Sequence, residues 1–69
     1  MKKVETYGLY YYIVEGERED EAAEELDRTV DFLNSPACRH LSGEELLTEL
    51  ADARKSICEK FGVTIKASI

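Results

Sequence analysis

The segment from Glu5 to Val14 constrains the fold most, because it predicts a β-strand that is largely apolar or aromatic on both faces. Four tyrosines lie within it, together with other strand-favouring residue types. Alternation assigns Tyr7, Leu9, Tyr11 and Ile13 to one face, and Thr6, Gly8, Tyr10, Tyr12 and Val14 to the other. A chain of 69 residues is too short to bury both faces of such a strand. We therefore expect the face with Tyr10 and Tyr12 to form an interface, and Gly8 to mark either a bulge or the close approach of another backbone.

An amphipathic helix is predicted from Glu17 to Leu33. Leu26, Val30 and Leu33 recur at helical spacing, and acids crowd the first turns, where the helix dipole favours negative charge. Pro36 ends this helix, because the residue before a proline avoids helical backbone.

A second helix is predicted from Gly43 to Phe61. Ser42 and Glu45 have the spacing of a capping box, in which each side chain binds the other residue's backbone N–H. Gly62 stands where a left-handed residue commonly ends a helix. The alternating residues from Val63 to Ile69 then predict a half-buried strand.

The predicted order is strand, helix, helix, strand in a single small domain, residues 1–69. This is an α+β arrangement with two antiparallel strands and both helices packed on one face of the sheet. The expected buried residues are Leu9, Leu26, Val30, Leu33, Leu46, Leu50, Ile57, Phe61 and Ile65. Because a two-stranded sheet has open edges and the core is thin, we expect a partner or dimer mate to extend the sheet.

Negative charge is concentrated in one part of the chain. The chain has fifteen acids and nine lysines and arginines, and nine of those acids lie between positions 15 and 31. That segment carries a formal charge of −7, whereas the rest of the chain carries +1. On a helix, one stripe of acids is predicted, flanked by Glu17 and made of Asp20, Glu24, Asp27 and Asp31. Neighbours in the stripe lie about 5–6 Å apart, an interval comparable with the phosphate spacing of a nucleic-acid strand.

Two interpretations of these acids remain open. Like charges at this spacing destabilise a helix slightly, which favours a binding role toward a basic partner. Alternatively, the acidic face only solvates the protein. Direct nucleic-acid binding is disfavoured, because the bases form no concentrated patch and the net charge is −6.

The residues suited to catalysis or metal binding are few. Cys38, His40 and Cys58 are the candidate soft metal ligands, but they lack the paired spacing of structural zinc sites. Cys58 also falls on the apolar stripe of the second helix, where a free cysteine behaves as a small hydrophobe. No phosphate-binding loop, dinucleotide fingerprint or nucleophile elbow is present. We expect no enzymatic activity, no metal and no cofactor.

These features predict a cytoplasmic protein, because the first residues lack the apolar core of a signal peptide and no apolar run is long enough to span a membrane. The leading hypothesis is a non-enzymatic interaction module, a small acidic inhibitor that binds a basic, nucleic-acid-binding protein by phosphate mimicry. Its size and charge are compatible with a phage or mobile-element origin. The alternative is a self-associating accessory or structural subunit, a homodimer with a solvating acidic face. A small metal or thiol protein is the third hypothesis.

Overall fold

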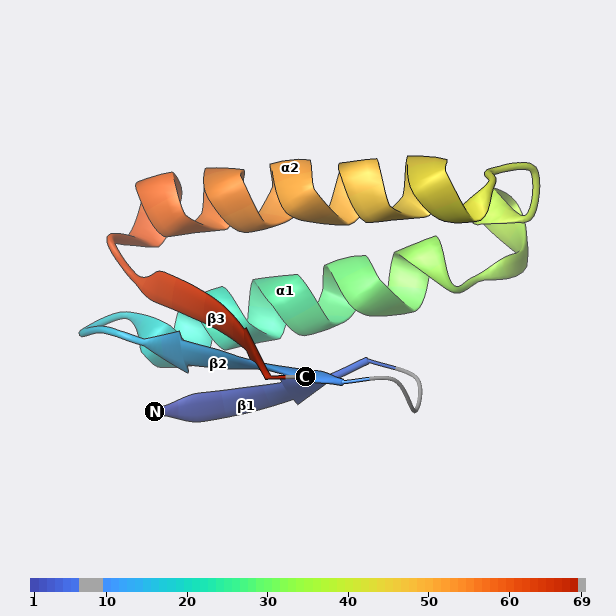
Figure 1. Ribbon diagram of the computed structural model, residues 1–69. Helices are drawn as coiled ribbons and strands as arrows, with labels where there is room; N and C mark the ends of the chain where they lie inside the picture. The colour runs from blue at the N-terminus through green and yellow to red at the C-terminus, as the bar shows by residue number, and fades with distance from the viewer. Residues whose placement is uncertain (7–9, 69) are drawn as a thin grey trace.

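The computed structural model describes residues 1–6 and 10–68, and within them the chain forms an α+β fold with two α-helices and a three-stranded antiparallel sheet (Figure 1). The elements are β1 (Lys2–Glu5), β2 (Tyr11–Glu15), α1 (Glu19–Leu33), the 3₁₀-helix η1 (Pro36–Cys38), α2 (Gly43–Phe61) and β3 (Thr64–Ser68). Neither helix is long and apolar enough to cross a membrane in the part of the chain that is described.

The predicted single strand from Glu5 to Val14 is wrong, because this region contributes to two strands of a hairpin. β1 pairs with β2 from Lys2 opposite Val14 to Glu5 opposite Tyr11. The Thr6 N–H donates to the Tyr10 carbonyl at 3.0 Å, and the Thr6 hydroxyl donates to the same oxygen at 2.5 Å. β1 was not predicted because its sequence, Lys-Lys-Val-Glu, does not show the apolar alternation expected of a strand. The expectations for Tyr7, Gly8 and Leu9 lie outside the described residues.

β2 is the central strand of the sheet. β1 lies on one side of it and β3 on the other, with Val14 opposite Ile65 and Tyr12 opposite Ala67. The sheet therefore has three strands rather than the predicted two. Neither edge of β2 is free to pair with another chain, so the expectation of association through this strand needs revision. Extension of the sheet by a partner stays a prediction that would have to use β1 or β3.

Both helices follow their predicted limits closely. α1 begins at Glu19, two residues later than expected, and ends at Leu33 before Ser35 and Pro36. The delay follows from a tight turn at Gly16, whose φ is +149°. A Cβ at Gly16 would lie 2.8 Å from Cγ1 of Val63, so the turn also packs closely against the start of β3.

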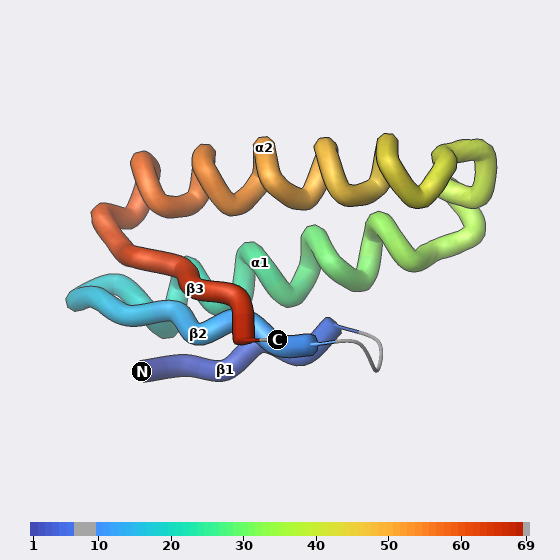
Figure 2. The backbone as a smooth tube through the Cα atoms, viewed as in Figure 1, coloured from blue at the N-terminus to red at the C-terminus, as the bar shows by residue number. Residues whose placement is uncertain are grey.

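The predicted caps of α2 are present. The Ser42 side chain accepts from the Glu45 N–H at 3.2 Å, and the Glu45 carboxylate accepts from the Ser42 N–H at 3.1 Å. Hydrogen bonding of the Glu45 carboxylate to the Ser42 backbone and side chain lowers the pKa of Glu45, because it stabilises the ionised form. At the other end, Gly62 has φ +65° and donates to the Cys58 carbonyl at 2.9 Å. The antiparallel course of the two helices is plain in the chain trace (Figure 2).

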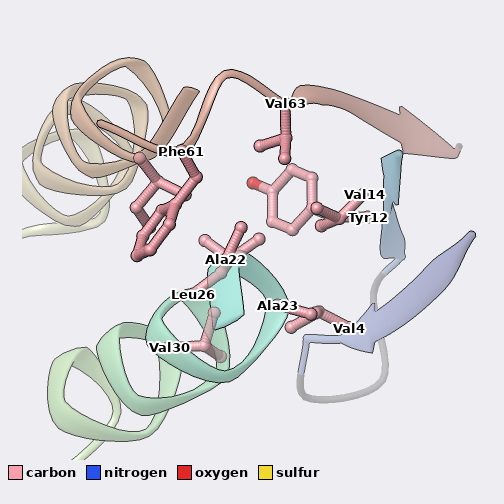
Figure 3. Close-up of a cluster of buried hydrophobic side chains, with 10 residues drawn as sticks. Val4, Tyr12, Val14, Ala22, Ala23, Leu26, Val30, Phe61 and Val63 are labelled. Carbon is pink, nitrogen blue, oxygen red and sulfur yellow. The ribbon is translucent and has the colours of Figure 1, made fainter. Parts of the chain in front are cut away.

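The core lies where α1, the C-terminal half of α2 and the sheet meet (Figure 3). Its buried members are Val4, Tyr12, Val14, Ala22, Ala23, Leu26, Val30, Ile57, Phe61 and Val63. Leu33, Leu46, Leu50 and Ile65, which were expected to be buried, are only half-buried. Leu46 and Leu50 are less buried because the backbone of α2 approaches the sheet only at β3, whereas that of α1 packs against β1 and β2.

Candidate interaction surface

The acidic stripe consists of Glu17, Asp20, Glu24, Asp27 and Asp31, and all five side chains are exposed. The last four are on α1, while Glu17 lies in the turn before it. The buried face of α1, which carries Ala22, Ala23, Leu26 and Val30, points the other way. Helical periodicity therefore predicted the position of the stripe on α1 correctly.

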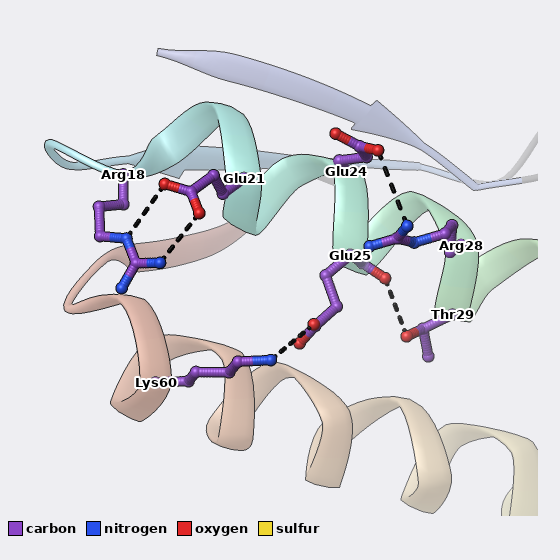
Figure 4. Close-up of polar contacts among 7 residues, drawn as sticks. All are labelled: Arg18, Glu21, Glu24, Glu25, Arg28, Thr29 and Lys60. Atoms are coloured by element: carbon purple, nitrogen blue, oxygen red, sulfur yellow. Dashed lines mark hydrogen bonds and ion pairs between the residues drawn. The ribbon is translucent and has the colours of Figure 1, made fainter.

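Contacts on the two flanks of α1 show which way the stripe faces. Lys2 of β1 lies 3.1 Å from the Asp20 carboxylate, so the stripe borders the β1 edge of the sheet. On the opposite flank, Lys60 of α2 lies 2.9 Å from the Glu25 carboxylate (Figure 4). The stripe thus faces away from α2 and toward solvent.

Exposed cations contact two members of the stripe, Asp20 and Glu24. Lys2 pairs with Asp20, and Arg28 lies 3.7 Å from the Glu24 carboxylate on the same helix. All four of these side chains are exposed, and exposed ion pairs contribute only about 0–1 kcal/mol. Long, solvated side chains of this kind exchange partners easily, so both carboxylates remain accessible to a competing cation.

Two neighbouring carboxylates at the start of α1, Glu19 and Glu21, are held in their ionised form by charged partners. Arg18 binds Glu21 through two hydrogen bonds of 3.1 and 2.9 Å, which lower the pKa of Glu21 and raise that of Arg18 (Figure 4). The amino terminus binds Glu19 and lowers its pKa. Glu19 and Glu21 therefore keep their negative charge to a lower pH than an ordinary glutamate.

The prediction that Tyr10 and Tyr12 lie on the open face of the sheet is wrong. Tyr12 is 1% exposed and points into the core, while Tyr10 is half-buried against the same cluster. Their rings meet edge to face with centroids 5.3 Å apart, and their hydroxyls are 3.0 Å apart. The strand was apolar on both faces, so alternation alone could not tell which face is covered. Because it cannot reach another chain, Tyr12 is no interface residue in this fold.

The open face of the sheet carries the β2 residues that alternate with the buried Tyr12 and Val14. Tyr11 and Ile13 are half-buried there, beside Lys3 and Lys66 on the neighbouring strands. The Lys3 ammonium lies 4.4 Å from the centre of the Tyr11 ring. The lysine stems thus cover apolar surface that the chain has no second layer to bury.

Arg54 is a residue that no sequence pattern singles out. Its guanidinium carbon lies 5.1 Å from the centre of the Tyr12 ring. Its Nε is buried and has no hydrogen-bond partner among the described residues. Burial and the Tyr10 hydroxyl raise the pKa of Tyr12 to about 12, although the positive charge of Arg54 opposes this rise. The pair is thus a cation–π contact at the edge of the core.

A small apolar cavity of about 240 Å³ lies between the C-terminal half of α1 and the N-terminal half of α2. Its wall includes Val30, Leu33, Leu46 and Leu50. Its polar side chains already have intramolecular partners: the Thr6 hydroxyl bonds the Tyr10 carbonyl, and the Asn34 amide donates to the Val30 carbonyl at 2.9 Å. The cavity is smaller than most ligand pockets and gathers no group suited to acid–base or nucleophilic chemistry.

The three candidate soft ligands remain separate. Cys38 is buried, Cys58 is half-buried and His40 is exposed, and both cysteines are free thiols. No group of three or more His, Cys, Asp or Glu side chains in residues 1–6 and 10–68 is arranged to hold a metal ion.

Comparison with known proteins finds no match to a protein family, to a curated protein or to a solved structure.

Proposed function

We propose that this chain is a cytoplasmic, non-enzymatic interaction module whose acidic stripe binds a basic protein surface. That surface is one that otherwise contacts phosphates, as in a nucleic-acid-binding complex. The observation that carries the proposal is the exposure of all five stripe carboxylates, four of them on the flank of α1 that faces away from α2. These carboxylates form a row of negative charge along one side of the helix.

The distribution of charge supports a binding role over simple solvation. Solvation is served by acids spread over the whole surface, yet the segment 15–31 carries −7 while the rest of the chain carries +1. Within the stripe, Asp20 and Glu24, and Asp27 and Asp31, are four residues apart and repel each other by a few tenths of a kcal/mol per pair. A solvating surface gains nothing from that cost, whereas a cationic partner offsets it.

Two matched variants test the proposal. The stripe variant carries Asp20→Asn, Glu24→Gln, Asp27→Asn and Asp31→Asn. The α2 control carries Glu44→Gln, Glu49→Gln, Asp52→Asn and Glu59→Gln, all exposed on the other helix. Each raises the formal net charge by four, from −6 to −2. Each also removes one acid from the first turn of its helix, so the sets differ mainly in location.

Each protein is immobilised and exposed to a lysate of the native cells, and the captured proteins are identified by mass spectrometry. We expect a basic protein that the wild type and the α2 control retain and the stripe variant loses. If the stripe only solvates, both variants should retain the same proteins as the wild type. If both variants lose the same proteins, net charge rather than the stripe is responsible.

A further inference from the structure

The two edges of the sheet differ in how well the helices cover them. Val4 on β1 is 3% exposed beneath α1, and Tyr12 and Val14 on β2 are 1% and 0% exposed. On β3, the residues paired with these last two, Ala67 and Ile65, are exposed and half-buried. The helix-facing surface of the sheet is thus closed at β1 and open at β3. Among the described residues, β3 also has no strand on its outer side, and such an edge is a template for another strand.

One flank of α2 is open on the same side. Leu47, Ala51, Arg54 and Cys58 lie on one line at helical spacing. Lys60 contacts α1 from the other flank, and Arg54 reaches Tyr12 on the sheet, so this line lies on the sheet side of α2, where Leu47 also lines the small cavity. Leu47 is 61% exposed, Ala51 is exposed and Cys58 is half-buried. The line spans about 16 Å of helix.

We propose that the outer edge of β3 and this flank of α2 form the interface of a symmetric homodimer. Two copies of β3 pair antiparallel about Ile65 and join the two sheets into one of six strands. This surface is distinct from the acidic stripe, which borders β1 at the opposite edge of the sheet. The dimer therefore leaves both stripes exposed, and the two proposals stand or fall separately.

The sequence of β3 is compatible with pairing to itself in this register. Pairing two copies about Ile65 places the isoleucines opposite each other on the helix side, where α2 leaves Ile65 half-buried. On the open face, the same register places Thr64 opposite Lys66 of the second copy. Pairing about Lys66 would instead oppose two lysines, which is unfavourable. A symmetric contact requires self-complementarity of this kind.

The charge distribution also favours a second copy. The chain as a whole carries −6, which opposes self-association, but the excess lies in the segment 15–31 at the other edge. The remainder of the chain, which includes α2 and β3, carries +1, so the β3 side lacks this excess of negative charge. In this register only residues 64–66 of β3 pair within the strand, which alone falls short of the roughly 1,200–2,000 Å² buried in stable interfaces. The flank of α2 supplies additional apolar area beside it.

Sedimentation of two matched variants tests the interface. Leu47→Glu with Ala51→Glu places two charges on the proposed flank, while Thr48→Glu with Ser56→Glu places two on exposed positions outside it. We expect the wild type and the control to sediment at twice the chain mass of 7.8 kDa, and the flank variant at the chain mass with an unchanged helical circular dichroism spectrum. A wild type that stays monomeric at high concentration overturns the dimer. A flank variant that stays dimeric removes α2 from the interface.

Cross-linking tests the strand register without relying on that variant. In a background in which Cys38 and Cys58 are alanine, Ile65→Cys and Lys66→Cys are oxidised separately. Residues opposite each other across an antiparallel pair have Cα atoms about 4.5–5.5 Å apart, within disulfide reach. We expect a covalent dimer from Ile65→Cys and little from Lys66→Cys. The reverse result contradicts the register, and no cross-link from either contradicts strand pairing.

Discussion

At the scale of single residues, replacing two of the glycines by alanine should have opposite effects on stability. Gly16 has a positive φ, and a Cβ there would lie 2.8 Å from Val63, so Gly16→Ala should destabilise the fold by about 1–3 kcal/mol. Gly43 opens α2 with nothing within 4 Å of its Cβ position, so Gly43→Ala should be neutral or stabilise by up to about 1 kcal/mol. Urea unfolding of both variants measures the difference. Equal effects would show that the turn at Gly16 is not under this constraint.

Burial of Tyr12 should make the free energy of unfolding decrease at alkaline pH. Its pKa is raised from 10.0 to about 12 because burial disfavours the phenolate. The neutral form therefore contributes stability that is fully present below about pH 10 and is lost as the pH rises toward 12. Two pKa units correspond to about 3 kcal/mol. Tyr12→Phe should lose about 0.5–1.5 kcal/mol at neutral pH through the missing hydroxyl contact.

The free energy of unfolding of wild type and Tyr12→Phe, measured between about pH 9 and 12, separates this effect from other alkaline titrations. The wild type should lose more stability than the variant over this range, since only the wild type has the buried hydroxyl. Parallel losses in the two proteins would show that Tyr12 is not the group responsible.

At the scale of elements, the helices were predictable and the sheet was only partly so. The limits of α2 follow from local chemistry, namely the cap formed by Ser42 and Glu45 and the left-handed Gly62. Each of these signals involves residues within a few positions of the helix end, so the sequence alone predicts them. The β1–β2 hairpin lacks such a local signal. Which face of β2 becomes buried depends on its pairing with Val4 and Ile65 in the neighbouring strands. The alternation of residues within β2 alone does not predict this pairing.

The candidate site was also only partly predictable from the sequence. Asp20, Glu24, Asp27 and Asp31 share one exposed face because helical periodicity requires it. Their orientation toward the β1 edge was not predictable, since it rests on the contact between Lys2 and Asp20. The contact of Arg54 with Tyr12 likewise joins elements 42 residues apart in sequence, which no local pattern reports.

Unequal burial along the helices gives a prediction for their leucines. Leu26 of α1 is fully buried, so Leu26→Ala should cost about 2–5 kcal/mol. Leu50 of α2 is only half-buried beside the small cavity, so Leu50→Ala should cost no more than about 2 kcal/mol. Denaturant unfolding of the two variants gives the comparison. A loss at position 50 as large as that at 26 would place the N-terminal half of α2 within the core.

At the scale of the whole molecule, the fold has two sides with different character. The β1 edge is covered by α1 and bordered by the acidic stripe, while the β3 edge is open and lacks this excess of negative charge. Neutralising the stripe should therefore change stability by less than about 1 kcal/mol. The relief of repulsion between neighbouring acids offsets the loss of exposed ion pairs such as those of Asp20 and Glu24. Loss of binding in that variant is then attributable to the surface and not to unfolding.

The association rate of the captured basic partner, measured against salt concentration, tests the binding role of the stripe most directly. Electrostatic steering raises the association rate at low salt and fades as salt screens it. We predict that the wild type and the α2 control bind rapidly with a steep salt dependence, and that the stripe variant binds slowly with a shallow one. A stripe variant that associates as fast as the wild type at low salt would contradict the account.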